Sequence, residues 1–338
     1  MNKKKLLTSI SVAALSILSC VSYADTDTRY PSRNISDIVT WSAGGGTDVI
    51  NRVITASMSG YLGTNINVLN KPGGVSGSVG LLEGYKSKPD GYTIIGLSES
   101  NVTAAVMGGW ENRMDVFDYF IVASSPDVLS VSKRSSYKNL AELVKYIKAN
   151  PGKVRVGAGS SGSLHHINYL AFAKGIQGEM NFIPYPGSSK SQNAALSGEV
   201  DVVITSVAEQ NQLIQSGDFV ALGTLTNDSF QVGDISIPSA IKAYPALGDY
   251  LPISQSIGFA IKKETPKDIK KKIAGAFVSA MESDEVKKYA AENYYTLVGD
   301  FGKKANERMA RLESLFSWTL WDLKAAKISP ATLGIPKP

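Results

Sequence analysis

Strand-like and helix-like segments alternate along most of this chain, and several of the junctions between them are turns built from glycine and serine. The segments 36–41, 65–70 and 91–98 have the composition of short strands, whereas residues 48–62 place their apolar side chains on one helical face. This alternation is typical of α/β proteins with parallel sheets. We therefore predict an α/β fold.

The first 24 residues have the layout of a secretory signal. Three lysines at 3–5 precede an apolar segment at 6–18, and small residues lead up to Ala24. The apolar segment is too short to span a bilayer comfortably. We predict cleavage after Ala24 and a location in the periplasm. A lipoprotein signal that ends at Cys20 is the alternative.

Removal of this signal changes what the chain can do chemically. It takes away the only cysteine, so we expect neither a disulfide nor a thiol nucleophile. It also takes away three of the lysines behind the formal charge of +5. The nearly neutral remainder has no electrostatic footprint for nucleic acid, and no later segment has the length and apolarity of a membrane span.

Two similar segments suggest how the remaining chain is divided. Residues 127–147 and 256–277 each combine an apolar strand, a basic end, a Ser or Thr helix start and a helix. Chance similarity of two strand–helix units is one explanation. The other is that each segment marks a crossing between domains, which predicts a first domain at 25–123 plus 227–338 and a second at 124–226. A cleft between two such domains is a common ligand site.

The turn at 41–53, WSAGGGTDVINRV, is the first candidate site. It lacks the GK[ST] triplet of a triphosphate loop, and Val49 stands where a dinucleotide fingerprint needs its third glycine, so we expect no cofactor. Gly44, Gly45 and Gly46 let a ligand approach the backbone, and Thr47 or Asp48 is expected to cap the helix. The free amides of the first helical turn attract anions.

A second turn, VGAGSSGSLHHIN at 156–168, offers the hydroxyls of Ser160, Ser161 and Ser163 beside another helix start. Two such turns that face each other would hold a small anion from both sides. His165 and His166 point about 100° apart on a helix, which argues against a shared metal ion, and His166 is a candidate hydrogen-bonding group. A hydrolase that uses Ser161 and His165 is an alternative, although the turn lacks the G-x-S-x-G spacing.

Four further residues end predicted strands, where ligands bind in open sheets. Ser98 and Ser206 are polar, and Trp41 and Tyr185 are expected either to line the cleft or to belong to the core.

Several motifs, in order, resemble the solute-binding receptors of tripartite tricarboxylate transporters, the Bug-type receptors. They are WSAGGGTD at 41–48, NKPGG with Gly77 at 70–77, PDGYT at 89–93, NPGKVRVGAGSSGSLHH at 150–166, and YPGSS with GEVDV at 185–202. The resemblance covers nearly the whole mature chain. Thr40 and Ser42 replace common prolines, His165 stands where Ser or Thr is common, and Ile257 replaces a frequent aromatic residue.

The resemblance implies a periplasmic-binding-protein-like fold of type II, with two α/β domains that close by a hinge around a central cleft. It implies a receptor without enzymatic activity for a small organic carboxylate, namely a di- or tricarboxylate, an aromatic acid or an acidic amino acid. Amides, hydroxyls and water would hold this ligand, and the receptor would deliver it to integral-membrane transporter subunits. We expect no metal, and a monomer. An exported hydrolase that uses Ser160 or Ser161, and a sensing receptor, are the rival functions. The first-turn contacts carried over are Ser42, Ala43, Gly44, Gly45, Gly46, Thr47 and Asp48.

Overall fold

The structure is a computed structural model that describes residues 30–338, of which Pro31–Pro338 form one compact unit. The predicted signal, its cleavage after Ala24 and the alternative lipid site at Cys20 lie outside the described residues. Over the described range, no helix is both long enough and apolar enough to cross a membrane.

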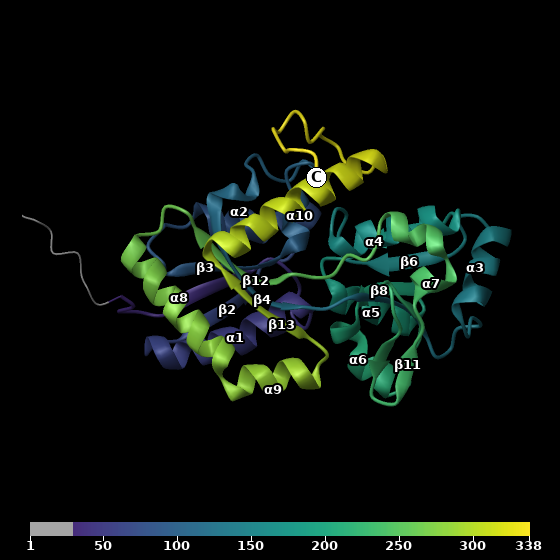
Figure 1. The fold of residues 1–338 in the computed structure, drawn as a ribbon, viewed down its shortest axis with the longest axis horizontal. Coiled ribbons are helices and arrows are strands. Elements are labelled where there is room, and N and C mark those ends of the chain that lie inside the picture. The colour runs from purple at the N-terminus through teal and green to yellow at the C-terminus, as the bar shows by residue number, and fades with distance from the viewer. Residues whose placement is uncertain (1–29) are drawn as a thin grey trace, which may run out of the picture. The chain divides into compact units, whose positions relative to one another are not determined.

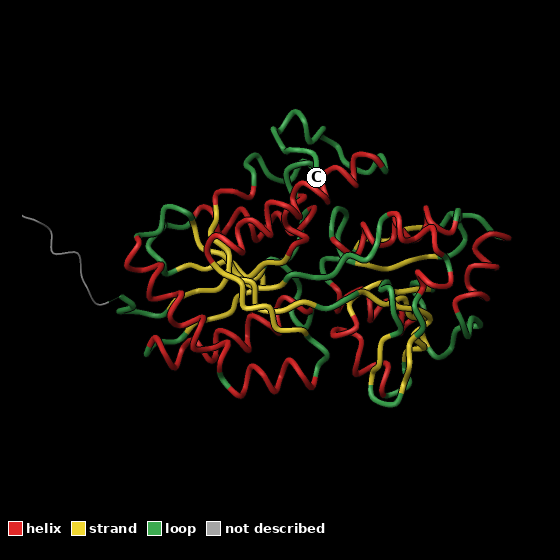
Figure 2. The backbone as a smooth tube through the Cα atoms, in the orientation of Figure 1, coloured by secondary structure: helices red, strands yellow, loops and turns green. Residues whose placement is uncertain are grey.

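The strands form two main sheets, each flanked by helices (Figure 2). The first has six strands in the order β13-β4-β12-β3-β1-β2, and the second has five in the order β7-β6-β8-β5-β9. The six strands of the first sheet are β1 (Ile35–Val39), β2 (Ile66–Asn70), β3 (Thr93–Ser98), β4 (Phe117–Ser124), β12 (Ile257–Lys262) and β13 (Thr296–Phe301). Those of the second are β5 (Asp127–Ser132), β6 (Arg155–Ala158), β7 (Asn181–Pro184), β8 (Val202–Ser206) and β9 (Phe219–Thr224). The strands β10 (Phe230–Val232) and β11 (Ile235–Ile237) form a separate hairpin.

Helices cover both faces of the six-stranded sheet. In Figure 1, α2 and α10 lie on one side of it, and α1 and α9 lie on the other. The α-helices are α1 (Gly46–Leu62), α2 (Ser78–Lys86), α3 (Leu140–Ala149), α4 (Leu164–Ile176), α5 (Ser188–Ser197), α6 (Val207–Gln215), α7 (Ala240–Ala243), α8 (Lys267–Glu282), α9 (Asp284–Glu292) and α10 (Gly302–Asp322). Short 3-10 turns are η1 (Val75–Gly77), η2 (Glu99–Thr103), η3 (Met114–Val116) and η4 (Pro245–Asp249).

The strand directions correct the expectation of parallel sheets, because both sheets are mixed. β1 pairs in parallel with β2 and β3, and β6 with β7 and β8. By contrast, β12 runs antiparallel to β3 and β4, and β5 antiparallel to β8 and β9. β5 and β12 each enter from the other sheet and not through a helical crossover on their own sheet, so the rule that makes neighbouring strands parallel does not apply to them.

The two similar sequence segments occupy similar places. β5 lies between β8 and β9, and β12 lies between β3 and β4. Each strand is followed by a helix, α3 in one case and α8 in the other. The placement fits two crossings of the chain, whereas the domain boundaries at 124 and 226 stay a prediction.

The helix predicted at 48–62 is confirmed as α1, which begins two residues earlier. Ile50, Ile54 and Met58 form its buried face. Gly63 ends it in the left-handed conformation, with a φ of 66°, and donates its amide to the carbonyl of Ser59. The helix therefore starts directly at the glycine turn that follows β1.

Gly258 in the middle of β12 gives the first testable prediction. A Cβ atom there would lie 1.9 Å from the carbonyl oxygen of Phe120 on β4. Gly258→Ala must therefore push β12 and β4 apart, and we expect a loss of about 3 kcal/mol in the free energy of unfolding. Denaturant titration measures this loss. Gly60→Ala in α1, where nothing lies within 4 Å of the new Cβ, is the control and should leave stability unchanged or higher. Equal stability of both variants would contradict the prediction.

Candidate ligand-binding site

Hydrogen bonds to Asp48 fix the conformation of the turn between β1 and α1. Gly44 has a φ of +79°, and its amide donates to Asp48 Oδ2 at 2.9 Å. Burial alone would raise the pKa of Asp48, but hydrogen bonds from Arg52, Gly44 and Asn70 outweigh this effect and lower it. The helix N-cap is Gly45, without a side-chain cap, so the expected capping by Thr47 or Asp48 is wrong. Asp48 instead accepts a hydrogen bond from the Gly44 amide within the turn. The amides in the first turn of α1 can therefore bind a partner from another part of the chain.

The second turn, between β6 and α4, contacts the six-stranded-sheet side directly. Ser160 Oγ accepts a hydrogen bond from the Ser76 amide at 3.1 Å, and the Ser161 carbonyl accepts from the same amide at 3.2 Å. Thr103 Oγ1 donates to the Gly162 carbonyl at 2.7 Å. Ser163 caps α4. Ser160 and Ser161 therefore connect the β6–α4 turn to Ser76 in η1.

The third turn, between β7 and α5, meets the first turn. Ser42 Oγ donates to the Pro186 carbonyl at 2.7 Å, and Ser189 Oγ donates to the Ala43 carbonyl at 2.9 Å. Tyr185 points elsewhere, since its hydroxyl donates to Glu199 Oε1 at 2.7 Å. The turns after β1, β6 and β7 all border one cavity, although β1 belongs to one sheet and β6 and β7 to the other.

A small cavity of about 20 Å³ lies where these turns meet, with room for about one water molecule. Of the predicted site residues, those that line it are Trp41, Gly45, Gly46, Thr47, Ser98, Ser163 and His165. Those outside its lining are Ser42, Ala43, Gly44, Asp48, Ser160, Ser161, His166, Tyr185 and Ser206. The lining residues that sequence reasoning missed are Ser100, Gly159, Gly187, Ser188, Glu209 and Gln255.

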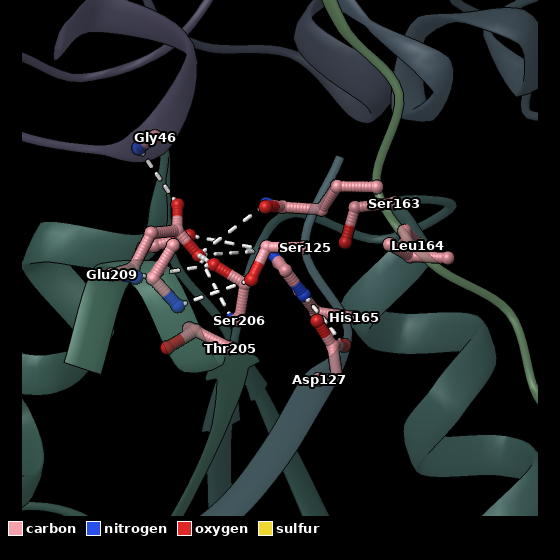
Figure 3. Close-up of polar contacts among 12 residues, drawn as sticks. Gly46, Ser125, Asp127, Ser163, Leu164, His165, Thr205, Ser206 and Glu209 are labelled. Carbon is pink, nitrogen blue, oxygen red and sulfur yellow. Dashed lines mark hydrogen bonds and ion pairs between the residues drawn. The ribbon is translucent and has the colours of Figure 1, made fainter. Parts of the chain in front are cut away.

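Glu209 is the main addition to the predicted site. Its Oε2 accepts hydrogen bonds from the amide and the hydroxyl of Ser206, which completes a capping box at the start of α6. Its Oε1 reaches the Gly46 amide at 2.7 Å. Figure 3 shows the carboxylate pointing from α6 toward Gly46. One buried carboxylate therefore joins the helix starts of α6 and α1.

His165 is held between two carboxylates. Its Nδ1 lies 2.7 Å from Asp127 Oδ2, as Figure 3 shows, and its Nε2 lies 3.7 Å from Glu209 Oε2. Burial would lower the pKa of His165, but the charge and the hydrogen bond of Asp127, with smaller contributions from Glu209 and Glu99, raise it to about 9. The ring is therefore an imidazolium at neutral pH.

The pKa of the neighbouring histidine, His166, is shifted in the opposite direction. His166 Nδ1 accepts a hydrogen bond from the Gly162 amide at 3.1 Å, and its ring lies against Phe182 with 4.2 Å between centroids. Burial lowers the pKa of His166 to about 4, so this ring is neutral at pH 7. The two histidines point to different partners, and among the described residues no cluster of three or more His, Cys, Asp or Glu is placed to hold a metal ion.

The hydrolase alternative can be compared with this geometry. His165 Nε2 lies 3.2 Å from Ser188 Oγ, and with Asp127 on Nδ1 the three side chains have the order of a Ser-His-Asp triad. A general base must be unprotonated, however, and the raised pKa of His165 disfavours that state near neutral pH. His165 is therefore better placed as a hydrogen-bond donor than as a base.

Glu99 is a further carboxyl group near the cavity, beside Asp127 and Glu209. It precedes the lining residue Ser100, and the Ser100 hydroxyl and the Ser256 amide donate to its two oxygens. Burial raises the pKa of Glu99 to about 7. Among the described residues around the cavity, His165 thus lies near the carboxyl groups of Asp127 and Glu209.

A larger cavity of about 570 Å³ lies elsewhere, against β4, α8 and α10. Phe117 and Phe120 line it together with Lys270, Lys303 and Glu313. It contains none of the predicted site residues, and none of the glycine and serine turns borders it. We therefore place the candidate site at the smaller cavity.

Comparison with known proteins bears on the family and the fold of this chain. The profile described as "Tripartite tricarboxylate transporter family receptor" matches residues 50–315. The protein BugT of Bordetella pertussis is 33% identical over 236 residues, which are 68% of this chain and 71% of BugT. Among solved structures, the periplasmic binding protein BugD has a TM-score of 0.78 at 21% identity, over 91% of this chain and 100% of BugD. MatC from Rhodopseudomonas palustris with bound malate has a TM-score of 0.74 at 21% identity, over 87% of this chain and 99% of MatC.

Proposed function

We infer the function of this chain from its family: it belongs to the receptors of the tripartite tricarboxylate transporter family. It is a solute-binding protein. We propose further that it works in the periplasm, captures a small organic carboxylate at the cavity described above, and delivers it to the membrane subunits of a tripartite transporter. The structure of MatC with malate supports the ligand class by analogy.

One observation carries the ligand proposal. The Gly46 amide at the start of α1 already binds a carboxylate, that of Glu209, at 2.7 Å. Helix starts favour anions through their free amides and the helix dipole. A ligand carboxylate that reaches the same amide would find the same hydrogen bond, and no basic side chain is required.

The proposed binding cycle follows from the size of the cavity. A volume of about 20 Å³ is too small for any organic acid, so the turns must separate before a ligand enters. We propose a hinge motion between the predicted domains, 25–123 plus 227–338 and 124–226, near residues 124 and 226. The contacts that open are those of Ser42 with Pro186, Ser76 with Ser160 and Ser161, and Gly46 with Glu209.

A thermal-shift screen against organic acids tests the ligand proposal. A ligand at 100 times its dissociation constant stabilises the folded protein by about 2.7 kcal/mol, which should raise the melting temperature by roughly 5 °C. Native mass spectrometry of the purified protein identifies a ligand that remains bound. If no carboxylate raises the melting temperature while an ester is hydrolysed, the receptor proposal fails in favour of the hydrolase.

Uptake measurements separate transport from sensing. Cells that lack the receptor gene should take up the labelled ligand more slowly, and uptake should recover when the gene is returned. If the protein binds the ligand but its deletion leaves uptake unchanged, the sensing function replaces the transport function.

A further inference from the structure

We propose that this protein docks on an anionic membrane surface through a patch of lysines, and that the cavity beside this patch accepts a lipid acyl chain. The lysine patch consists of residues 86–88, at the end of α2, and residues 262–272, which run from the end of β12 into α8. The inference goes beyond the proposed function, because it concerns the surface on which the protein is held and not the solute that it binds.

The lysine patch concentrates positive charge. Its two segments contain eight lysines and two acidic residues, which leaves an excess of six positive charges. This excess is larger than the formal charge of +5 of the whole sequence, so the remainder of the sequence is net negative. Lys262 joins the two segments, because its Nζ donates to the Ser87 carbonyl at 3.3 Å and lies 4.7 Å from the centre of the Tyr85 ring. Such a local excess of one sign attracts a surface of the opposite charge.

The lysines of α8 lie at the end of the helix that disfavours them. Four lysines, at 267 and 270–272, belong to the first six residues of α8, and its last turn has no basic residue. The start of a helix carries the positive end of the dipole, which favours carboxylates over cations. Lys267 and Lys271 are exposed, and neither forms an ion pair within the described part of the chain. A local preference that is violated without internal compensation is expected at functional sites.

The cavity of about 570 Å³ opens directly beside the lysine patch, since Lys263 and Lys270 belong to its lining. It begins where β13 ends: β13 pairs with β4 as far as Phe120, and the start of β4 borders the cavity instead of a strand. Phe117 and Phe301 also line it, and Phe301 is 40% exposed. The volume is within the range of about 300–1,000 Å³ that is usual for small-molecule sites. A ligand that fits both features has an anionic end and an apolar end, as a phospholipid does.

The acidic residues of the cavity do not cancel the charge of the patch, because most of them are already paired. The ion pairs are those of Asp118 with Lys270, Glu307 with Lys303, and Glu313 with Arg113.

Exposed apolar side chains beside the lysines favour a membrane over an acidic protein. Tyr61 is 58% exposed, and its hydroxyl would lie 2.8 Å from a Cβ at Gly275 of α8. Val278, which is 39% exposed, follows Gly275 by three positions, and Lys271 precedes it by four. These positions share one face of the helix. Lysine, tyrosine and aliphatic side chains on one face are typical of helices that lie at a membrane interface.

The proposed docking surface is separate from the candidate ligand-binding site. In Figure 1, α8 lies at the end of the six-stranded sheet that is remote from the five-stranded sheet. The cavity beside the lysine patch and the smaller cavity have no lining residue in common. Membrane docking and solute binding can therefore be measured independently.

Vesicle flotation with the full mature chain tests the docking. The probes are vesicles of phosphatidylcholine alone and vesicles in which phosphatidylglycerol makes up about a third of the lipid. We expect the protein to float with the anionic vesicles and not with the neutral ones. Most of this binding should disappear when salt is raised from about 0.1 M to about 1 M, which shortens the Debye length from about 10 Å to about 3 Å.

A double variant, Lys267→Gln with Lys271→Gln, tests the lysine patch itself. It should bind the anionic vesicles about 10- to 30-fold more weakly, because each lysine near an anionic surface strengthens binding about fivefold. The matched control, Lys145→Gln with Lys148→Gln, removes the same charge from exposed positions of α3 and should change the binding by less than about twofold. An equal loss in both double variants would show that net charge alone is responsible, and would overturn the assignment to α8.

A soluble short-chain lipid tests the cavity. Dihexanoyl phosphatidylglycerol is compared by calorimetry with glycerol phosphate, which carries the anionic group and no acyl chain. We expect the lipid to bind with one molecule per protein and at least about 10-fold more tightly. Ala274→Glu places a carboxylate in the lining of the cavity and should remove most of this preference, because a charge beside an acyl chain is unfavourable.

The possible results separate the parts of the proposal. If anionic vesicles bind no more protein than neutral ones, membrane docking is ruled out, and binding of polyglutamate under the same conditions would point to an acidic protein instead. If glycerol phosphate binds as tightly as the short-chain lipid, the acyl-chain site is ruled out. Neither result affects the proposed solute receptor, because no organic acid takes part in these measurements.

Discussion

Replacing Gly46 with valine is expected to abolish ligand binding and to leave the protein folded. A Cβ atom at Gly46 would lie 2.8 Å from Glu209 Oε1, 3.1 Å from Ile257 Cδ1 and 3.1 Å from the Tyr295 hydroxyl. The two methyl groups of valine extend further into a cavity of only about 20 Å³. Overpacking of this kind costs about 1–3 kcal/mol, and its upper end corresponds to a loss of at least about 100-fold in affinity.

The control for this variant lies in the same helix. Gly60→Val places the same side chain in open space, since nothing lies within 4 Å of a Cβ there, and it should bind as the unmodified protein does. Calorimetry measures the affinities, and small-angle scattering shows whether the Gly46→Val variant stays expanded when the ligand is added. Unchanged affinity in Gly46→Val would remove the β1–α1 turn from the site.

Replacing His165 with glutamine is expected to destabilise the protein by about 3–5 kcal/mol, because it leaves the carboxylates of Asp127 and Glu209 buried without their cation. Asn168 still donates to Asp127 Oδ2 at 2.7 Å, but a neutral amide does not replace a charge. Urea denaturation at pH 7 measures the loss in the free energy of unfolding.

The same variant should also change how stability depends on pH. The folded protein holds the pKa of His165 near 9, against 6.5 for an ordinary histidine, so the folded state binds the proton more tightly. This contribution, about 3 kcal/mol, is fully present below pH 6.5 and is lost as the pH rises through 9. Burial raises the pKa values of Asp37 and Glu99 to about 8 and about 7. These two groups therefore also lower the free energy of unfolding as the pH rises, but over lower pH ranges than His165. In the His165→Gln variant, the free energy of unfolding should therefore depend less on pH, mainly between pH 7 and 9.

His166→Gln provides the matched control. The pKa of His166 is lowered to about 4, so its contribution is present above pH 6.5 and is lost as the pH falls toward 4. That variant should leave the alkaline part of the curve unchanged. An alkaline loss of stability that persists in full in His165→Gln would show that the Asp127–His165 pair is not its source.

Local patterns predicted the local parts of this site well. The glycine turn after β1, the helix that follows it and the serine turn after β6 are all present, because strand, turn and helix signals are short-range. The capping box of Ser206 and Glu209 is short-range as well, but it was not among the predictions. What the pattern could not supply is the second contact of Glu209, with an amide 163 positions earlier in the chain.

The missed residues and elements depend on contacts far along the chain. Gln255 lies in the segment before β12, where its backbone amide donates to the Ser125 carbonyl. No periodicity of the sequence marks it as a site residue. β12 joins β3 and β4 in antiparallel pairing, which strand–helix alternation alone could not indicate. Ser42 and Ser161 stay predicted ligand contacts; in this structure Ser42 bonds to the Pro186 carbonyl and the Ser161 carbonyl accepts from the Ser76 amide, both on segments far along the chain.

The hydrogen bond between Gly46 and Glu209 has a thermodynamic consequence for how this receptor responds to solute concentration. In the proposed binding cycle, any free energy that favours the shut conformation is subtracted from the observed affinity, because the bond between Gly46 and Glu209 breaks before a solute enters. A bias of about 1.4 kcal/mol toward that conformation weakens apparent affinity tenfold. A substitution at Ser206, which holds the Glu209 carboxylate, can therefore change the range of solute concentrations over which the receptor fills, without changing a residue that contacts the solute.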